Sequence, residues 1–174
     1  MNLARSAGVA AIMVLGGVAI LALGSRAVLP LDPVPITGQT LAVTTIGALY
    51  GWRLGAVTVI AWLVLAAAGA PLLAEGAAGV GRFTGASGGY LFAFPWAAAL
   101  VGWLSKRGWR RFGLAFAAML AGNALCLAIG AIWLAGFVGP VGAVTKGVTP
   151  FLLGALLKSF VGALLVTLVW RHLD

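Results

Sequence analysis

Lys158 has the clearest capacity for chemistry in this 174-residue sequence, because it is the only charge in the apolar run at 147–170. An ammonium near the middle of a membrane helix costs about 3 kcal/mol to insert, so it should face the protein interior and have a partner. The apolar runs contain no acidic residue. A carboxylate carried by a ligand would supply the missing charge. The alternative is that the side chain extends to a membrane interface.

Residues 29–40, LPLDPVPITGQT, form a second unusual stretch, which we call the proline segment. Its three prolines fix backbone φ angles, and a stiff loop loses little entropy when it closes over a ligand. Thr37 and Gln39 offer hydrogen-bond donors and acceptors at the start of the next apolar run. The stretch predicts either a lid over a binding site or a surface loop whose prolines mark helix ends.

Residues 75–91, EGAAGVGRFTGASGGYL, form the glycine-rich segment. Its glycines allow close backbone approach, as in a loop that folds around a ligand. It does not match a dinucleotide or Walker phosphate loop, which needs a third spaced glycine or a lysine that this segment lacks. Arg82 and Tyr90 are its chemical groups. They indicate either ligand contacts or, alternatively, a charge and an aromatic anchor at the membrane interface.

Asn123 is a polar residue inside the fifth apolar run. Intramembrane amides usually bond a neighbouring helix, so structural and ligand-binding roles are both open. The sequence has one histidine, His172, and no pair of carboxylates, metal-ligand cluster or nucleophile with a base. We therefore expect no catalytic residue, no metal and no cofactor. The protein should bind and move a molecule rather than convert it.

The composition indicates a membrane protein, because 63% of the residues are hydrophobic and only 8% are charged. The net charge of +8 would suggest nucleic acid in a soluble protein. Here the basic residues punctuate apolar runs, which indicates topology signals and contacts with membrane lipid rather than nucleic acid. The single cysteine, Cys126, allows no intramolecular disulfide.

The apolar runs predict an all-α, polytopic membrane protein in which one domain, residues 1–174, forms a bundle of six transmembrane helices. The uncharged run at 112–145 is too long for one helix, and we expect its glycines and Pro140 to break it near residue 135. The first run is interpreted as a retained helix rather than a signal peptide. The predicted helices are 7–27, 37–50, 54–73, 87–105, 112–134 and 147–170.

Basic residues predict the orientation, because the cytoplasmic side of a membrane protein carries the excess of lysine and arginine. With the N-terminus inside, seven basic residues fall on the inner side: Arg5, Arg53, Lys106, Arg107, Arg110, Arg111 and Arg171. Three fall outside: Arg26, Arg82 and Lys146. Both termini are therefore expected in the cytoplasm of a multi-pass plasma membrane protein. The proline and glycine-rich segments then share the outer face, where we expect a binding site.

The first helix carries small residues about four apart, which let another membrane helix approach closely. This pattern predicts a partner-binding face made of Ala4, Ala7, Gly8 and Ala11.

Five stretches together resemble the BioY family, the biotin-specific S components of energy-coupling-factor (ECF) transporters. They are, in order, PVPITGQTLAV, RLGAVTVIAWLVLAAAGAPLLA, GASGGYLFAFPWAAALVGWL, GNALCLAIGAIWLAG and TPFLLGALLKSF. The resemblance spans about residues 28–170 and implies a six-helix bundle that binds biotin near the outer surface, beneath the proline segment. It also implies that Lys158 contacts the vitamin, and the lysine charge favours a contact with the valerate carboxylate.

The resemblance further implies roles for Gly88, Gly89 and Tyr90, which match a Gly-Gly-Tyr motif beside the bicyclic ring or beside the loop that shapes its cavity. Two positions depart from the family: Ala86-Ser87 replaces Pro-Thr, and Ala155 replaces an aspartate that would accept a hydrogen bond from the ureido ring. Asn123, Gln39 or a backbone carbonyl are the candidates to replace that contact.

Partners are also implied by the resemblance: a transmembrane coupling subunit of the EcfT or BioN type and cytosolic ATPases of the EcfA or BioM type. Some members of the family are thought to act without them. We therefore expect biotin uptake, driven by ATP hydrolysis on separate subunits. The alternatives are an S component for a different small vitamin and a membrane scaffold that transports nothing.

Overall fold

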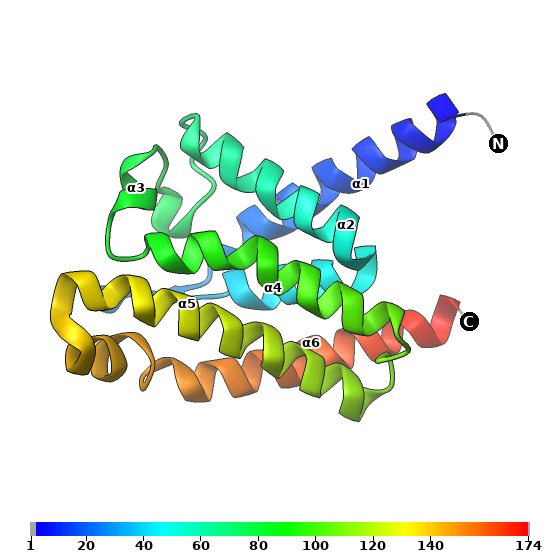
Figure 1. Cartoon of the computed structure of the whole chain (residues 1–174). Coiled ribbons are helices and arrows are strands. Elements are labelled where there is room, and N and C mark those ends of the chain that lie inside the picture. Colours follow the sequence, from blue (N-terminus) through cyan, green and yellow to red (C-terminus); the bar gives the residue numbers. More distant parts are fainter. Residues whose placement is uncertain (1–2, 174) are drawn as a thin grey trace.

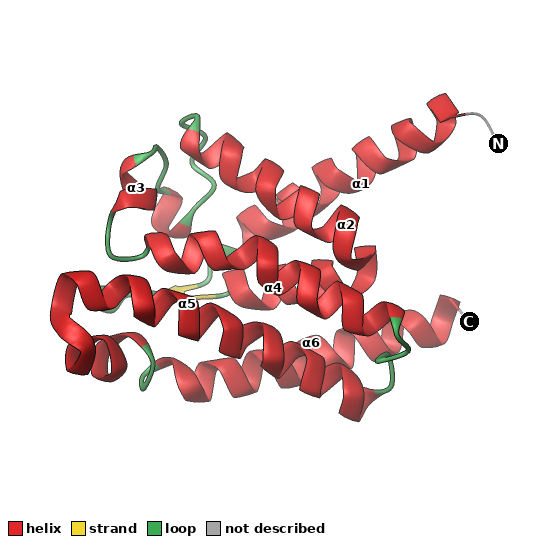
Figure 2. Ribbon diagram, in the orientation of Figure 1, coloured by secondary structure: helices red, strands yellow, loops and turns green. Residues whose placement is uncertain are grey.

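The computed structural model describes residues 3–173 of the chain and, within them, the side chains of residues 7–172. Long helices dominate the structure (Figure 1), and loops lie mainly at their ends (Figure 2). The long helices are α1 (Leu3–Gly24), α2 (Gln39–Ala67), α4 (Gly88–Lys106), α5 (Phe112–Gly147) and α6 (Phe151–Leu173). The shorter elements are β1 (Val28–Leu29), β2 (Ile36–Thr37), the 3-10 helix η1 (Ala74–Gly76) and α3 (Gly81–Thr84).

Helix α2 bends sharply at Gly51, whose φ of 79° and ψ of 172° are not helical. Glycine adopts this conformation readily because it has no Cβ. The two arms pack closely, so that a Cβ built on Gly55 would lie 3.0 Å from the Cα of Gly47. Figure 1 shows the bend in the cyan ribbon. Because α2 supplies two helical segments, 39–50 and 52–67, the prediction of a bundle of six helices is confirmed.

All five long helices are long and apolar enough to cross a membrane. The first arm of α2, at 39–50, is roughly 18 Å long at 1.5 Å per residue, and the hydrocarbon core is about 30 Å thick. This arm therefore crosses only part of the bilayer. The proline segment directly precedes this arm.

The proline segment changes two of the predicted helix boundaries. The first helix ends at Gly24 instead of residue 27, because β1 and β2 pair antiparallel, with Val28 opposite Thr37. The second helix begins at Gln39 rather than residue 37 for the same reason.

Glycines explain further differences. The third helix, predicted to reach residue 73, ends at Ala67, because Gly69 has a φ of 109°. The break expected near residue 135 occurs at Gly139, which has a φ of 77°. Helix resumes at Pro140, since proline is tolerated in a first helical turn, where its missing N–H has no helical partner to lose. The fifth helix therefore extends well beyond the predicted residue 134.

Helix α4 packs between α2 and α5, and α6 closes the bundle against α5 and α2, whereas α1 packs on α2. The contact of α2 with α4 depends on glycines, which have no side chain. A Cβ on Gly102 would lie 2.5 Å from the backbone nitrogen of Trp52 and 2.6 Å from the carbonyl oxygen of Gly47. Backbone of one helix thus packs directly on backbone of the other.

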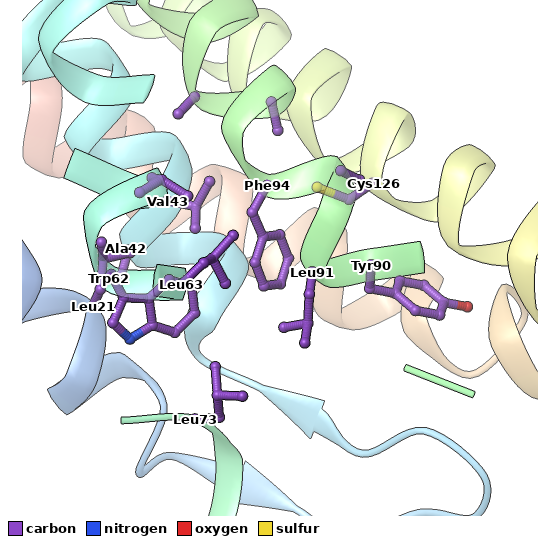
Figure 3. Close-up of a cluster of buried hydrophobic side chains, with 14 of the residues drawn as sticks. Leu21, Ala42, Val43, Trp62, Leu63, Leu73, Tyr90, Leu91, Phe94 and Cys126 are labelled. Carbon is purple, nitrogen blue, oxygen red and sulfur yellow. The ribbon is translucent and has the colours of Figure 1, made fainter. Parts of the chain in front are cut away.

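A hydrophobic cluster fills the centre of this packing (Figure 3). The Trp62 side chain is fully buried and stacks on Phe94, with ring centroids 6.0 Å apart. Its indole N–H donates to the carbonyl oxygen of Leu72 at 3.1 Å. This bond fixes the loop after α2, so the core also positions the chain that leads into the glycine-rich segment.

The loops separate into two groups at opposite ends of the bundle (Figure 1). The bend of α2, the α4–α5 loop and the end of α6 lie toward the end at which both termini are found. The ribbon of β1 and β2 and the α3 region lie at the other end. The proline and glycine-rich segments therefore share one end, as the charge pattern predicts.

We predict that Gly102→Ala destabilises the bundle by about 1–3 kcal/mol, because the added methyl group overpacks a contact between backbones. The measurement is the melting temperature of the purified protein in detergent. Gly16→Ala is the matched control, since a Cβ there meets nothing within 4 Å. Equal melting temperatures of the two variants would contradict the packing argument.

Candidate functional site

A cavity opens between the proline segment, the glycine-rich segment and the facing surfaces of α4, α5 and α6. Its walls are mainly apolar, with side chains that include Leu91, Phe94, Leu127 and Phe151. Six residues predicted from the sequence as ligand contacts come together in its lining: Thr37, Gln39, Arg82, Tyr90, Asn123 and Lys158.

Lys158 lies half-buried on α6. Its ammonium is hydrogen-bonded to Thr37 of the proline segment and to Thr40 in the first turn of α2. Its Nζ donates to the carbonyl oxygen of Thr37 at 2.8 Å and to the Thr40 hydroxyl at 3.0 Å. These acceptors are neutral, and no described acidic side chain forms a salt bridge with Lys158. An ammonium has three N–H groups, so one remains for a ligand. The side chain lines the cavity.

Gln39 holds the proline segment in place. Its Nε2 donates to the Ser25 hydroxyl at 3.1 Å, and its Oε1 accepts from the Thr37 hydroxyl at 3.0 Å. Ser25 in turn donates to the carbonyl oxygen of Leu21 at the end of α1. Because both ends of the buried Gln39 amide are occupied, its main contribution is to position the segment that covers the cavity.

Asn123 forms the inter-helix bond expected of an intramembrane amide and also lines the cavity. It is 3% exposed, and its Nδ2 donates to the carbonyl oxygen of Met119 at 3.0 Å and to the Ser159 hydroxyl at 3.1 Å. The second bond joins α5 to α6 beside Lys158. The amide oxygen has no hydrogen-bond partner among the described residues, and Asn123 lines the cavity. It therefore provides a buried acceptor for a ligand.

Tyr90 is buried, which excludes the alternative of an interfacial anchor. Its hydroxyl donates to the carbonyl oxygen of Gly147 at 2.7 Å, and its ring stacks on Phe151 with centroids 6.0 Å apart. The hydroxyl thus joins α4 to the end of α5. The ring forms part of the cavity wall.

Gly88 and Gly89 do not line the cavity, unlike the tyrosine that follows them. A Cβ on Gly89 would collide with the Trp133 side chain, and one on Gly88 would collide with the carbonyl group of Phe83. The small size of Gly89 therefore lets the start of α4 pack against α5, and that of Gly88 lets it pack against α3. Trp133 closes this contact by donating its indole N–H to the carbonyl oxygen of Gly85 at 3.0 Å.

Arg82 and Glu75 are exposed residues of the cavity lining, both from the glycine-rich segment. Glu75 was not predicted as a lining residue, although it is one of only three acidic residues in the chain. Its backbone has a φ of 58° and a ψ of 20°, a left-handed conformation that is uncommon without glycine. Ala155 also lines the cavity, so the position noted as a family departure is apolar there.

The predicted partner-binding face on α1 lies on a helix that packs mainly on α2. Ala7, Gly8 and Ala11 are exposed, and a Cβ on Gly8 would meet nothing within 4 Å. The Ala4 side chain lies outside the described residues.

The cavity is therefore suited to a mostly apolar ligand that carries a few polar groups. Small-ligand sites generally combine apolar walls with a few placed polar groups. Here the half-buried Lys158 offers a donor, the buried Asn123 an acceptor, and the exposed Arg82 a positive charge.

Comparisons with known proteins show the family of the chain. The BioY family model matches residues 2–174. The chain is 33% identical over 142 residues to a probable biotin transporter BioY of Pyrococcus horikoshii, covering 82% of this chain and 84% of that protein. It is 35% identical over 144 residues to the biotin transporter BioY of Rhizobium etli, covering 76% of each. A crystal structure of the S-component for biotin from an ECF-type ABC transporter matches with a TM-score of 0.84 and 26% identity, over 98% of this chain and 95% of that one.

We predict that Glu75→Gly stabilises the protein by about 1 kcal/mol, because glycine adopts left-handed backbone without the Cβ clash. Glu75→Ala is the control, since it removes the carboxylate and keeps the Cβ. In thermal melts of the purified protein, Glu75→Gly should melt above both the parent and Glu75→Ala. If the glycine and alanine variants melt together, the backbone at residue 75 is not strained.

Proposed function

Because the chain belongs to the BioY family, we propose that it binds biotin in the cavity beneath the proline segment and serves its uptake across the plasma membrane. The observation that carries this proposal is the cavity itself, which gathers polar groups from four separate parts of the chain around apolar walls. The protein is a multi-pass membrane protein, and its relatives are transporters rather than enzymes.

Biotin has three chemically distinct parts: a ureido group with N–H donors and a carbonyl, an apolar thioether ring with its chain, and a carboxylate. The apolar parts fit the walls formed by α4, α5 and α6. Two ways of seating the polar ends are open. The carboxylate pairs with Lys158, as its charge suggests, or the ureido group occupies that end and the carboxylate lies near Arg82.

The contacts around Lys158 favour the second arrangement. The amide nitrogen of Asn123 donates to Ser159, the residue next to Lys158. The free amide oxygen of Asn123 would attract a ureido N–H and repel a carboxylate. The remaining N–H of Lys158 can donate to the ureido carbonyl, which gives each of its three protons an acceptor. A charged carboxylate costs more to bury than a neutral ureido group, and Arg82 is exposed. We therefore propose that the bicyclic ring of biotin lies beside Lys158 and Asn123, with the carboxylate toward Arg82.

Transport requires more than capture. We propose that the small-residue face of α1, where Ala7, Gly8 and Ala11 are exposed, docks a transmembrane coupling subunit that carries cytosolic ATPases. The exposed space over Gly8 supports this role, because small residues let membrane helices approach closely. The cavity end would then face outward and the docking helix would lie along the lipid-facing side.

Calorimetric titration of the purified protein tests the function directly. One biotin should bind per chain, and Lys158→Met should weaken binding about 10- to 100-fold, because it removes a charge-assisted hydrogen bond. Absence of saturable binding, or preference for another vitamin, would contradict the proposal.

The same titration with biotinamide, which lacks the charge, tests the orientation. In the parent protein the loss of ligand charge should weaken binding by up to about fivefold, as expected for an exposed pair. In Arg82→Gln the two ligands should bind alike, and in Lys158→Met their difference should persist. If Lys158→Met abolishes the difference instead, the carboxylate lies on Lys158 and the proposed orientation is wrong.

A further inference from the structure

A second hollow lies at the opposite end of the bundle, where the α4–α5 loop meets the last turns of α6. Its lining is Arg110, Arg111, Phe112, Thr167, Trp170 and Arg171. Three of these six residues are arginines from two segments far apart in the sequence. Biotin capture gives none of them a role.

Arg110 is held in a defined position over this hollow. Its guanidinium carbon lies 3.7 Å from the centroid of the Trp170 ring, and its Nε donates to the carbonyl oxygen of Ser105 at 3.3 Å. Thr167 donates its hydroxyl to the carbonyl oxygen of Arg110 at 3.3 Å, which joins the loop to α6. The Nη groups of Arg110 have no partner among the described residues, so they remain available to an anion.

The described part of the chain offers no acidic side chain to this hollow. Asp32 and Glu75 are the only acids within it, and they belong to the proline and glycine-rich segments at the other end. Three guanidinium groups therefore lie together, and no acidic side chain among residues 7–172 lies beside them. Arginine binds phosphate oxygens through paired N–H groups, and its stacking on an aromatic ring leaves those groups free.

The position of the hollow beside an exposed apolar surface indicates that a phosphate bound there belongs to a lipid. The residues next to it on α5 and α6 are apolar and exposed, including Leu114 at 43%, Leu165 at 45% and Leu168 at 49%. These surfaces face the lipid chains in a bilayer. The arginines begin where this apolar surface ends, so they lie at headgroup depth, and Trp170 has the usual place of an interfacial aromatic residue.

We propose that this hollow binds the phosphate of an anionic phospholipid in the cytoplasmic leaflet. The arginines contact the phosphate, and the acyl chains lie along the exposed faces of α5 and α6. Basic pockets between membrane helices on the cytoplasmic side are suited to such headgroups. A bound lipid would fix the depth of this end of the bundle, where the α4–α5 loop and α6 are joined.

The test measures phosphatidylglycerol retained by the detergent-purified protein in native mass spectrometry. Arg111→Gln with Arg171→Gln removes two charges from the hollow, and neither side chain has a hydrogen bond with another described residue. Lipid affinity should fall about 30-fold, since each substitution removes the charge-assisted hydrogen bonds of an arginine to the phosphate. Arg53→Gln with Arg107→Gln is the matched control, because it removes two charges of the same end that lie outside the hollow. It should cost less than about threefold, since these exposed charges act on the bound lipid only across solvent and salt.

Three results would overturn the proposal. Equal losses in the two double variants would mean that the lipid responds to net charge alone. Equal retention of phosphatidylcholine and phosphatidylglycerol would exclude selection of the anionic headgroup. Displacement of the lipid by millimolar inorganic phosphate, together with equal thermal stabilisation by phosphate alone, would identify a soluble anion as the ligand. Biotin affinity should be unchanged in both double variants, which separates this test from that of the proposed function.

Discussion

A lysine inside an apolar helix needs acceptors for its protons, and this requirement shapes the outer end of the protein. Lys158 meets it with the carbonyl oxygen of Thr37 and the hydroxyl of Thr40. The proline segment is thereby joined to α6 across the cavity. Gln39 and Ser25 anchor the other side of the same segment to the end of α1. The cover of the cavity is therefore built from polar bonds that also leave one lysine proton for the ligand.

Space for this arrangement comes from glycine. Because α2 bends at Gly51, its first arm is too short to cross a whole bilayer. This leaves room for the proline segment before the start of the arm at Gln39. Close contact of α2 with α4 at Gly47 and Gly102 keeps the inner half of the bundle dense. The cavity lies beneath the proline and glycine-rich segments, and the arginines gather at the other end, beside the α4–α5 loop.

The sequence predicted several polar residues of the cavity lining. Lys158 and Asn123 are conspicuous as a charge and an amide in apolar runs, whereas Arg82 and the proline segment stand out between the runs through their glycine-rich and proline-rich surroundings. The functions of the glycines were not predictable, because Gly88 and Gly89 matter through contacts with residues distant in sequence. The conformation of Glu75 was also hidden, since a left-handed backbone leaves no signal in residue type. The break is at Gly139 and not near residue 135, as predicted, because several glycines in this stretch could each end the helix.

The most direct test is a crystal structure of the protein with biotin bound. Our account predicts biotin beneath the proline segment, with the ureido oxygen about 2.7–3.1 Å from Lys158 Nζ, a ureido nitrogen at hydrogen-bond distance from the Asn123 amide oxygen, and the carboxylate toward Arg82. Biotin bound outside this cavity, or seated in it with the carboxylate on Lys158, would contradict the account.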